Sequence, residues 1–114
     1  MLKFAVVAYK RPGFTAEEFL RYFESVHAPL ARKLPGLRKY VRNVVAPDVK
    51  RKHPGWDLIV ELYFDDRESM EAAWASPEGR AATDDFRACV DLERTTWSVV
   101  DEHIEIAPPR PPAS

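Results

Sequence analysis

The chain has 114 residues, of which 46% are apolar and 31% are charged, and this balance is ordinary for a single folded domain. Lys and Arg total 17 against 18 Asp and Glu, so the net charge of −1 offers no basic surface for nucleic acid. No apolar run is long enough to span a membrane, the first residues lack the core and cleavage pattern of a signal peptide, and Cys89 is the single cysteine. These features predict a cytoplasmic protein that has neither a disulfide nor a membrane contact.

The first predicted elements are a strand and a well-marked helix. Residues 2–9 are β-rich and apolar on both alternating faces, which is typical of a strand covered on both sides. Thr15 and Glu18 have the spacing of a capping box, so we expect a helix over residues 16–33. Pro29 lacks an amide donor, and we therefore expect this helix to bend or restart close to it.

Three more strands and two more helices are predicted from alternation and from helix-start signals. Asp65 with Glu68, and Ser76 followed by Pro77, are typical helix starts. In chain order the elements are a strand over 37–45, a strand over 57–64, a helix opened by Asp65, a helix over 77–90 and a strand over 94–106.

The element order β-α-β-β-α-β within residues 1–106 predicts a ferredoxin-like α+β fold, in which a four-stranded antiparallel sheet carries its helices on one face. The other face combines Ile59 and Tyr63 with Glu61, so it is too apolar for open water and too charged for a core. A face of this kind usually meets another chain, and we expect a homodimer through the sheet faces. The proline-rich residues 107–114 predict a mobile tail.

His27 is the main candidate for chemistry. It follows Phe19 and Phe23 at helical spacing, so the imidazole points to the apolar side of its helix. A histidine directed inward needs either a hydrogen-bond partner or a substrate. Because imidazole titrates near neutral pH, the functional interpretation is a general acid or base. The alternative is a structural histidine that is satisfied within a packed core.

A ring of mainly aromatic residues is a candidate substrate cavity between helices and sheet. Aromatic walls with a few polar groups suit a flat, hydrophobic, oxygenated molecule, and plain core packing is the alternative. Alternation separates Tyr40 from Asn43, and we expect Asn43 to face the cavity because apolar Val41 and Val45 share its side. The candidate substrate-binding residues are Asn43, Tyr63, Trp74, Phe86 and Trp97.

The remaining polar residues predict no further chemistry. Asp57 and Glu61 share a strand face, where ion pairs with Arg38 or Arg42 are expected in preference to a catalytic carboxylate pair. The three His residues and four Gly residues are scattered, without metal-ligand spacing or a phosphate-binding loop. We therefore expect neither a metal nor another cofactor.

Three groups of motifs occur in a recognisable order: KRPGFTAEEF at residues 10–19, VHAPL at 26–30 followed by LPGL at 34–37, and ELYFD at 61–65 followed by ASPEG at 75–79. Together they resemble the EthD family of dimeric α/β-barrel proteins. The resemblance implies a ferredoxin-like subunit whose dimer closes a β-barrel, and the histidine of the family's His-Ala-Pro motif corresponds to His27.

The resemblance implies a range of activities. Founding members accompany an ether-degrading oxidation system. Similar proteins act as lactone isomerases or as dehydratases and cyclases on polyketides, and the wider superfamily includes cofactor-free monooxygenases.

Three functional hypotheses follow. The first is an enzyme that performs proton-transfer chemistry (isomerisation, dehydration or cyclisation) on a hydrophobic, oxygenated, aromatic or polyketide-like substrate, with His27 as general acid or base. The second is a cofactor-independent monooxygenase in which Asn43, Tyr63 or Trp97 positions the substrate. The third is a non-catalytic protein that binds a ligand or assists an oxidative degradation system.

Overall fold

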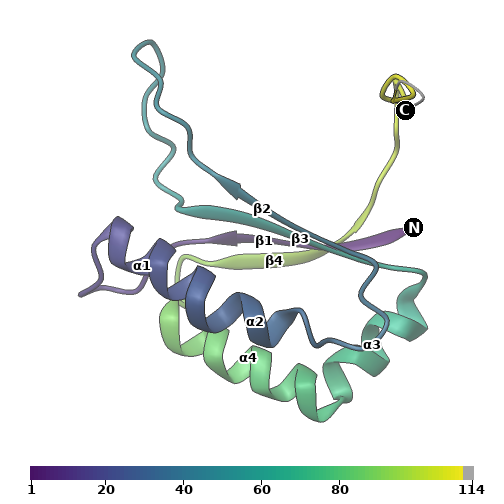
Figure 1. Ribbon diagram of the computed structural model, residues 1–114. Coiled ribbons are helices and arrows are strands. Elements are labelled where there is room, and N and C mark those ends of the chain that lie inside the picture. Colours follow the sequence, from purple (N-terminus) through teal and green to yellow (C-terminus); the bar gives the residue numbers. More distant parts are fainter. Residues whose placement is uncertain (112–114) are drawn as a thin grey trace.

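The computed structural model describes residues 1–111 and places a four-stranded sheet against a single layer of helices (Figure 1). In chain order the elements are β1 (Leu2–Ala8), α1 (Ala16–Tyr22), a π-helical turn (Phe23–His27), α2 (Ala28–Ala31), β2 (Lys39–Val44), β3 (Leu58–Phe64), α3 (Arg67–Ala75), α4 (Pro77–Cys89) and β4 (Thr96–Asp101). The predicted ferredoxin-like α+β fold is confirmed. Residues 102–111 form no helix or strand, and the last three positions of the predicted tail, 112–114, lie outside the described residues.

The sheet has the order β2-β3-β1-β4, and every neighbouring pair is antiparallel. The register aligns Phe4 of β1 with Leu62 of β3, and Leu62 in turn with Tyr40 of β2. Because partners across a ladder point to the same face, these three side chains all face the helices. The main core lies between this face and the helical layer and includes fully buried Phe23 and Phe64.

The first helix begins as predicted and is then interrupted by the π-helical turn. Thr15 accepts a hydrogen bond from the backbone N–H of Glu18, and the Glu18 carboxylate accepts one from the N–H of Thr15. Farther along, the N–H of Ala28 bonds to the carbonyl of Phe23, five residues back. The interruption lies just before Pro29, which cannot donate to this ladder. Such wide turns are frequent at functional sites.

The two later helices begin at neighbouring polar residues. Ser76 caps α4 by accepting from the N–H of Gly79, as predicted. The cap of α3 is Asp66, which accepts from the N–H of Ser69, so the prediction of Asp65 was wrong by one residue. Asp65 instead pairs with Arg38 across the chain, with Nη2 and Oδ2 2.9 Å apart. Asp65 and Asp66 are equally suitable as caps by sequence. The ion pair with Arg38 engages Asp65 and leaves Asp66 to cap the helix.

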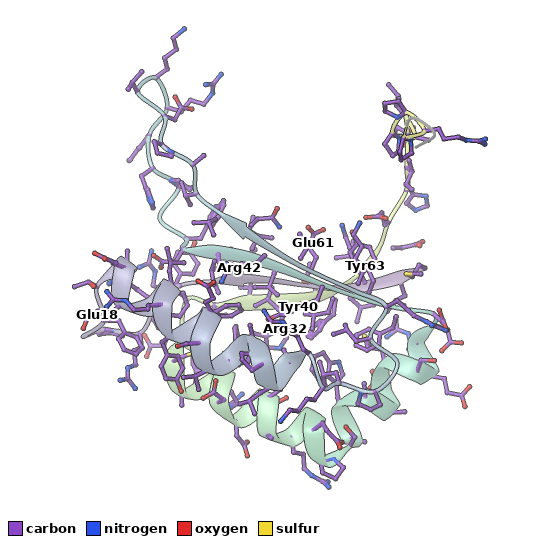
Figure 2. The ribbon with its side chains drawn as sticks, in the orientation of Figure 1. Glu18, Arg32, Tyr40, Arg42, Glu61 and Tyr63 are labelled. Carbon is purple, nitrogen blue, oxygen red and sulfur yellow. The ribbon has the colours of Figure 1, made fainter. Side chains whose placement is uncertain are left out.

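The outer face of the sheet, opposite the helices, carries a cluster of charges. Lys3 Nζ lies 2.6 Å from Glu61 and 3.0 Å from Glu102, and the Tyr63 hydroxyl donates to Glu102 at 2.8 Å. Figure 2 shows Glu61 and Tyr63 on this face. The expected pairing of Glu61 with Arg38 or Arg42 was wrong. Glu61 pairs with Lys3, whereas Arg38 pairs with Asp65 and Arg42 lies opposite Val60, on the helical face of the sheet.

The expected pairing of Asp57 with either arginine was also wrong, because its carboxylate instead accepts a hydrogen bond from the backbone N–H of Lys10 at 2.8 Å.

Within residues 1–111, no helix is both long and apolar enough to cross a membrane.

Candidate active site

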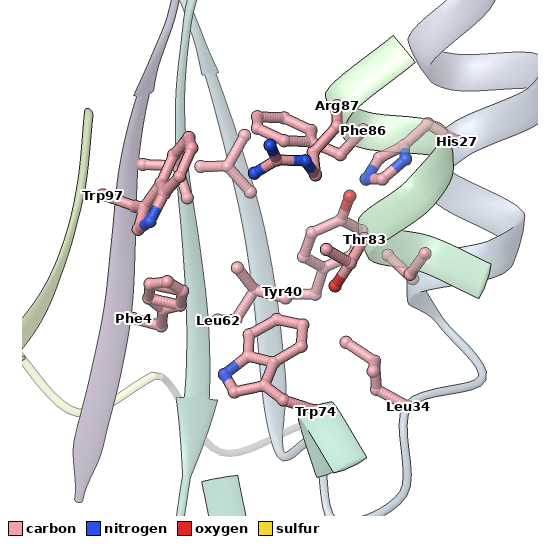
Figure 3. A pocket seen from close by; sticks show the side chains of 14 residues that line it. Phe4, His27, Leu34, Tyr40, Leu62, Trp74, Thr83, Phe86, Arg87 and Trp97 are labelled. Atoms are coloured by element: carbon pink, nitrogen blue, oxygen red, sulfur yellow. The ribbon is translucent and has the colours of Figure 1, made fainter. Parts of the chain in front are cut away.

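A pocket of about 320 Å³ lies between the helices and the sheet (Figure 3). Its volume is at the lower end of the usual range for small-molecule sites, about 300–1,000 Å³. The walls are mainly aromatic and include Phe4 and Trp74, whose rings meet edge to face with centroids 5.2 Å apart. Trp97 lines the pocket from the edge strand β4 and remains 43% exposed, so the pocket reaches solvent near it.

His27 lies at one end of the pocket, where the π-helical turn places it opposite α4. Its Nδ1 is 3.0 Å from Oδ2 of Asp85, and Oδ1 of that carboxylate accepts a hydrogen bond from the Tyr22 hydroxyl. A carboxylate only accepts, so Nδ1 carries the proton and donates. The remaining nitrogen, Nε2, then has a free lone pair. No hydrogen bond to Nε2 forms within residues 1–111, and His27 lines the pocket.

Burial keeps the imidazole neutral. His27 is 6% exposed, and its ring contacts Phe23 and Phe86 at centroid distances of 4.9 and 5.3 Å. Desolvation lowers the pKa of His27 below its ordinary 6.5, and the hydrogen bond to Asp85 opposes this shift only in part. At neutral pH the side chain is therefore a base with its lone pair available. The hydrogen bond to Asp85 raises the pKa of Tyr22 to about 12, so Tyr22 remains a donor.

Tyr40 supplies the second polar group of the pocket. Its hydroxyl oxygen is buried and has no hydrogen-bond partner within residues 1–111. Burial raises the pKa of Tyr40 to about 12, so the hydroxyl keeps its proton. Leaving such a group unpaired costs about 1–3 kcal/mol. An oxygen atom of a bound molecule would remove that cost by accepting from Tyr40, and Figure 3 shows the hydroxyl on the same side of the pocket as His27.

Four of the six sequence-predicted site residues meet at the pocket, namely His27, Trp74, Phe86 and Trp97. The other two do not. Asn43 lies on the outer face of the sheet, where its amide donates to the Ile59 carbonyl and to Glu61, and Tyr63 bonds to Glu102 on the same face. Placing them in the cavity was wrong. The register of β2 turns Tyr40, and not Asn43, to the helices, and Tyr63 alternates along β3 with the buried, helix-facing Leu62 and Phe64.

Sequence reasoning missed the residues that complete the site. Asp85 carried a usable signal, since a carboxylate between Ala82 and Cys89 interrupts the buried side of α4. Thr83 and Arg87 also line the pocket from α4. Both are exposed, so in the sequence they look like ordinary polar residues of a solvated helix surface. Tyr22 carried no clear signal.

The side chains around the pocket are suited to moving protons. Across residues 1–111, no group of three or more His, Cys, Asp and Glu side chains is arranged to hold a metal ion. The polar groups that do converge are a neutral imidazole, a buried hydroxyl and, at the pocket wall, the guanidinium of Arg87 (Figure 3). Together they form a base, a hydrogen-bond donor and a positive charge around one apolar space.

A model of the EthD domain family matches residues 11–93, which include His27, Tyr40 and Asp85. The chain belongs to the EthD family. An uncharacterized 11.0 kDa protein of Rhodococcus erythropolis, from the thcB-thcC intergenic region, is 27% identical over 79 residues, covering 69% of this chain and 75% of that protein.

Solved structures agree with the fold. The crystal structure of an EthD family protein from Bacillus halodurans has a TM-score of 0.76 and 27% identity, covering 90% of this chain and all (100%) of that one. A dimeric ferredoxin-like protein of unknown function from Thermobifida fusca has a TM-score of 0.66 and 14% identity, over 87% and 88% of the two chains. SnoaB from Streptomyces nogalater, a cofactor-independent oxygenase crystallised as a mutant, has a TM-score of 0.63 and 13% identity, over 92% and 95%.

Proposed function

We propose that this EthD-family protein is an enzyme that moves a proton on a small, hydrophobic, oxygen-bearing molecule, aromatic or polyketide-like, with His27 as general acid and base. The observation that carries the proposal is the state of the imidazole. Asp85 holds Nδ1 at 3.0 Å, while burial keeps the ring neutral and leaves Nε2 to the pocket. A base fixed in this way typically contributes ~10²–10⁴-fold to a rate.

The proposed reaction begins at a C–H bond next to a carbonyl. Nε2 of His27 takes the proton, the electron pair of the bond moves to the carbonyl oxygen, and an enolate forms. The Tyr40 hydroxyl donates to that oxygen, and the enolate is stabilised because the donor is already desolvated. Where the enolate is conjugated with a C=C bond, the imidazolium returns the proton to the far carbon of that system, which gives isomerisation. Where a hydroxyl group lies β to the carbonyl, the enolate re-forms the carbonyl and a C=C bond, and the imidazolium protonates the departing hydroxyl, which gives dehydration.

The pocket limits the size and polarity of the substrate. A volume of about 320 Å³ corresponds to roughly ten water molecules at about 30 Å³ each, enough for a compound of one or two rings. Trp74 and Trp97 offer aromatic surfaces against which a flat ring can stack. Arg87 adds a positive charge at the wall, which favours a substrate that becomes anionic during the reaction.

Replacing Tyr40 with Phe is expected to slow the proton transfer about 10²-fold, because it removes one donor to the developing oxyanion while keeping the ring. One- and two-ring ketones and lactones would be incubated with the protein in D₂O, and deuterium incorporation followed by NMR. Tyr9→Phe is the matched control, since Tyr9 lies outside the pocket and stacks with Arg94. The proposed role of Tyr40 fails if both variants exchange as fast as the unchanged protein.

The second candidate is a cofactor-independent monooxygenase. The shared fold with SnoaB and the presence of a base beside aromatic walls support it, because the same enolate can donate electrons to dioxygen. Oxygen consumption during turnover separates the two candidates, since isomerisation and dehydration consume none. The third candidate, a ligand-binding or auxiliary protein, requires saturable binding with neither deuterium exchange nor product formation.

We also propose that two copies associate through the outer faces of their sheets. That face carries half-buried aliphatic side chains at Ala5, Val7, Val41, Ile59 and Val100. Several ferredoxin-like neighbours, including the Thermobifida fusca protein, are dimeric. A face on which aliphatic side chains surround a compact charge cluster suits a self-complementary contact between identical chains.

A further inference from the structure

Two segments extend away from the body of the protein on the side of the outer sheet face (Figure 1). One is the long loop between β2 and β3, residues 45–57, and the other begins at the end of β4, residues 101–106. The radius of gyration is 15.4 Å, above the about 13 Å of a compact domain of this length. The exposed fractions of Val49, Ile104 and Ile106 are 102%, 68% and 89%. These apolar side chains are therefore free for a partner.

The two segments carry opposite charges. The first, called here the basic loop, contains Lys50, Arg51 and Lys52 against Asp48 and Asp57; the second, called here the acidic arm, contains Asp101, Glu102 and Glu105. Part of this charge is paired locally, between Arg51 and Asp48 and between Glu102 and Lys3, and Nε2 of His103 lies 3.3 Å from Oδ2 of Asp101. Among residues 1–111, Lys50, Lys52 and Glu105 form no ion pair.

The sheet topology keeps the two segments apart within one chain. The basic loop leads into Leu58, which lies opposite Ala8 at the end of β1, on the β2–β3 side of the sheet. The acidic arm starts at Asp101, which lies opposite Leu2 at the beginning of β1, on the far edge of the sheet. Loop and arm therefore project from diagonally opposite corners of the same face.

A second copy can bring these corners together. Two such sheets can pack face to face about a two-fold axis that runs along the other diagonal of the face. Rotation about this axis places the loop corner of one copy opposite the arm corner of the other. The basic loop of each copy then lies at the acidic arm of its partner, and the contact occurs twice. The strands of the two sheets cross at nearly right angles, which is one of the arrangements that packed sheets adopt.

We infer that the partner of these two segments is a second copy of this chain, whose acidic arm is held by the basic loop across the two-fold axis. The inference rests on the proposed dimer and adds to it the contacts that set the relative orientation of the two sheets. Rim contacts between opposite charges mainly determine orientation and partner choice, and salt weakens them.

Charge reversal tests the contact. A loop variant, Lys50→Glu with Lys52→Glu, and an arm variant, Asp101→Lys with Glu105→Lys, leave the Lys3 cluster unchanged. In sedimentation experiments at low salt, each variant alone is expected to raise the homodimer dissociation constant at least tenfold. The chain that carries both pairs of changes should return to within about threefold of the unchanged protein. An equimolar mixture of the two variants should form heterodimers, because every loop then meets an arm of opposite charge.

The control for the loop variant is Lys33→Glu with Arg80→Glu, at two exposed residues outside both segments, which changes the net charge by the same amount in the same direction. If this control weakens the dimer as much as the loop variant does, net charge explains the effect and the inferred contact is wrong. Unchanged dissociation constants in both variants would also overturn the contact while leaving the dimer in place. If the unchanged protein sediments as a monomer at high concentration, the proposed dimer itself falls.

Discussion

Replacing His27 with Gln is expected to lower the rate of the proposed reaction about 10²–10⁴-fold while leaving the chain folded. The glutamine amide can still donate to Asp85, yet it cannot take up a proton from the substrate. In the unchanged protein, kcat/KM should fall as the pH decreases through the pKa of His27, because protonation removes the lone pair of Nε2. That decline should be centred below pH 6.5, since burial lowers the pKa.

The matched control is His53→Gln. His53 is an exposed histidine in the loop between β2 and β3, where its Nδ1 accepts a hydrogen bond from the N–H of Gly55. It should retain full activity and the same pH profile. Circular dichroism and sedimentation would check that both variants remain folded and keep their oligomeric state. Near-normal turnover in the His27 variant would exclude the imidazole as the proton carrier.

Replacing Gly79 with Ala is expected to destabilise the protein by about 1–3 kcal/mol, as overpacking usually does. Helix propensity alone would predict that the change stabilises the protein, since Ala is better than Gly in a helix by about 1 kcal/mol. A Cβ at this position would lie 2.1 Å from the carbonyl oxygen of Ala73 and 2.7 Å from that of Trp74. The first turn of α4 would have to move away from the end of α3, and the pocket wall at Trp74 would move with it.

Urea denaturation of the variant measures this effect. Ala81→Gly, at an exposed position of the same helix, is the control, because it reports helix propensity in α4 without a close backbone contact. It should cost about 0.5–1 kcal/mol. If Gly79→Ala instead stabilises the protein by a similar amount, the close packing of α3 against α4 is not as described.

Local signals correctly predicted where α1 and α4 begin. The capping box of Thr15 and Glu18 and the Ser76-Pro77 start involve neighbours in the sequence, so they can be read without knowing the tertiary structure. The alternation of β3 was equally informative, since Leu58, Val60, Leu62 and Phe64 are all buried on the helical side. In both cases the deciding interactions are short-range or follow one strongly apolar face.

The orientation of β2 could not be predicted in the same way. This edge strand is covered only partly on either face, and its half-buried residues include both Tyr40 and Val41. The apolar residues on the side of Asn43 belong to the outer sheet face, which we propose to be covered by a second copy. Counting apolar residues therefore favoured the wrong face and left Tyr40 out of the site.

The partner of His27 was hidden for a different reason. Asp85 is 58 residues away in the sequence, and only the packing of α4 against the π-helical turn brings the two side chains together. A carboxylate within the apolar side of a helix predicts that the carboxylate has a hydrogen-bond partner, although the sequence does not say which residue that partner is. The pocket likewise depends on the spacing between helices and sheet, which no local pattern encodes.

The most direct measurement is an NMR titration of the His27 imidazole in protein labelled with ¹⁵N at its histidines, with and without a ligand that fills the pocket. The account predicts a ring protonated at Nδ1, a pKa below 6.5 and a shift of the Nε2 resonance when the ligand binds. A ring protonated at Nε2, or an Nε2 resonance that no pocket ligand alters, would contradict the central claim that this nitrogen is the base presented to the substrate.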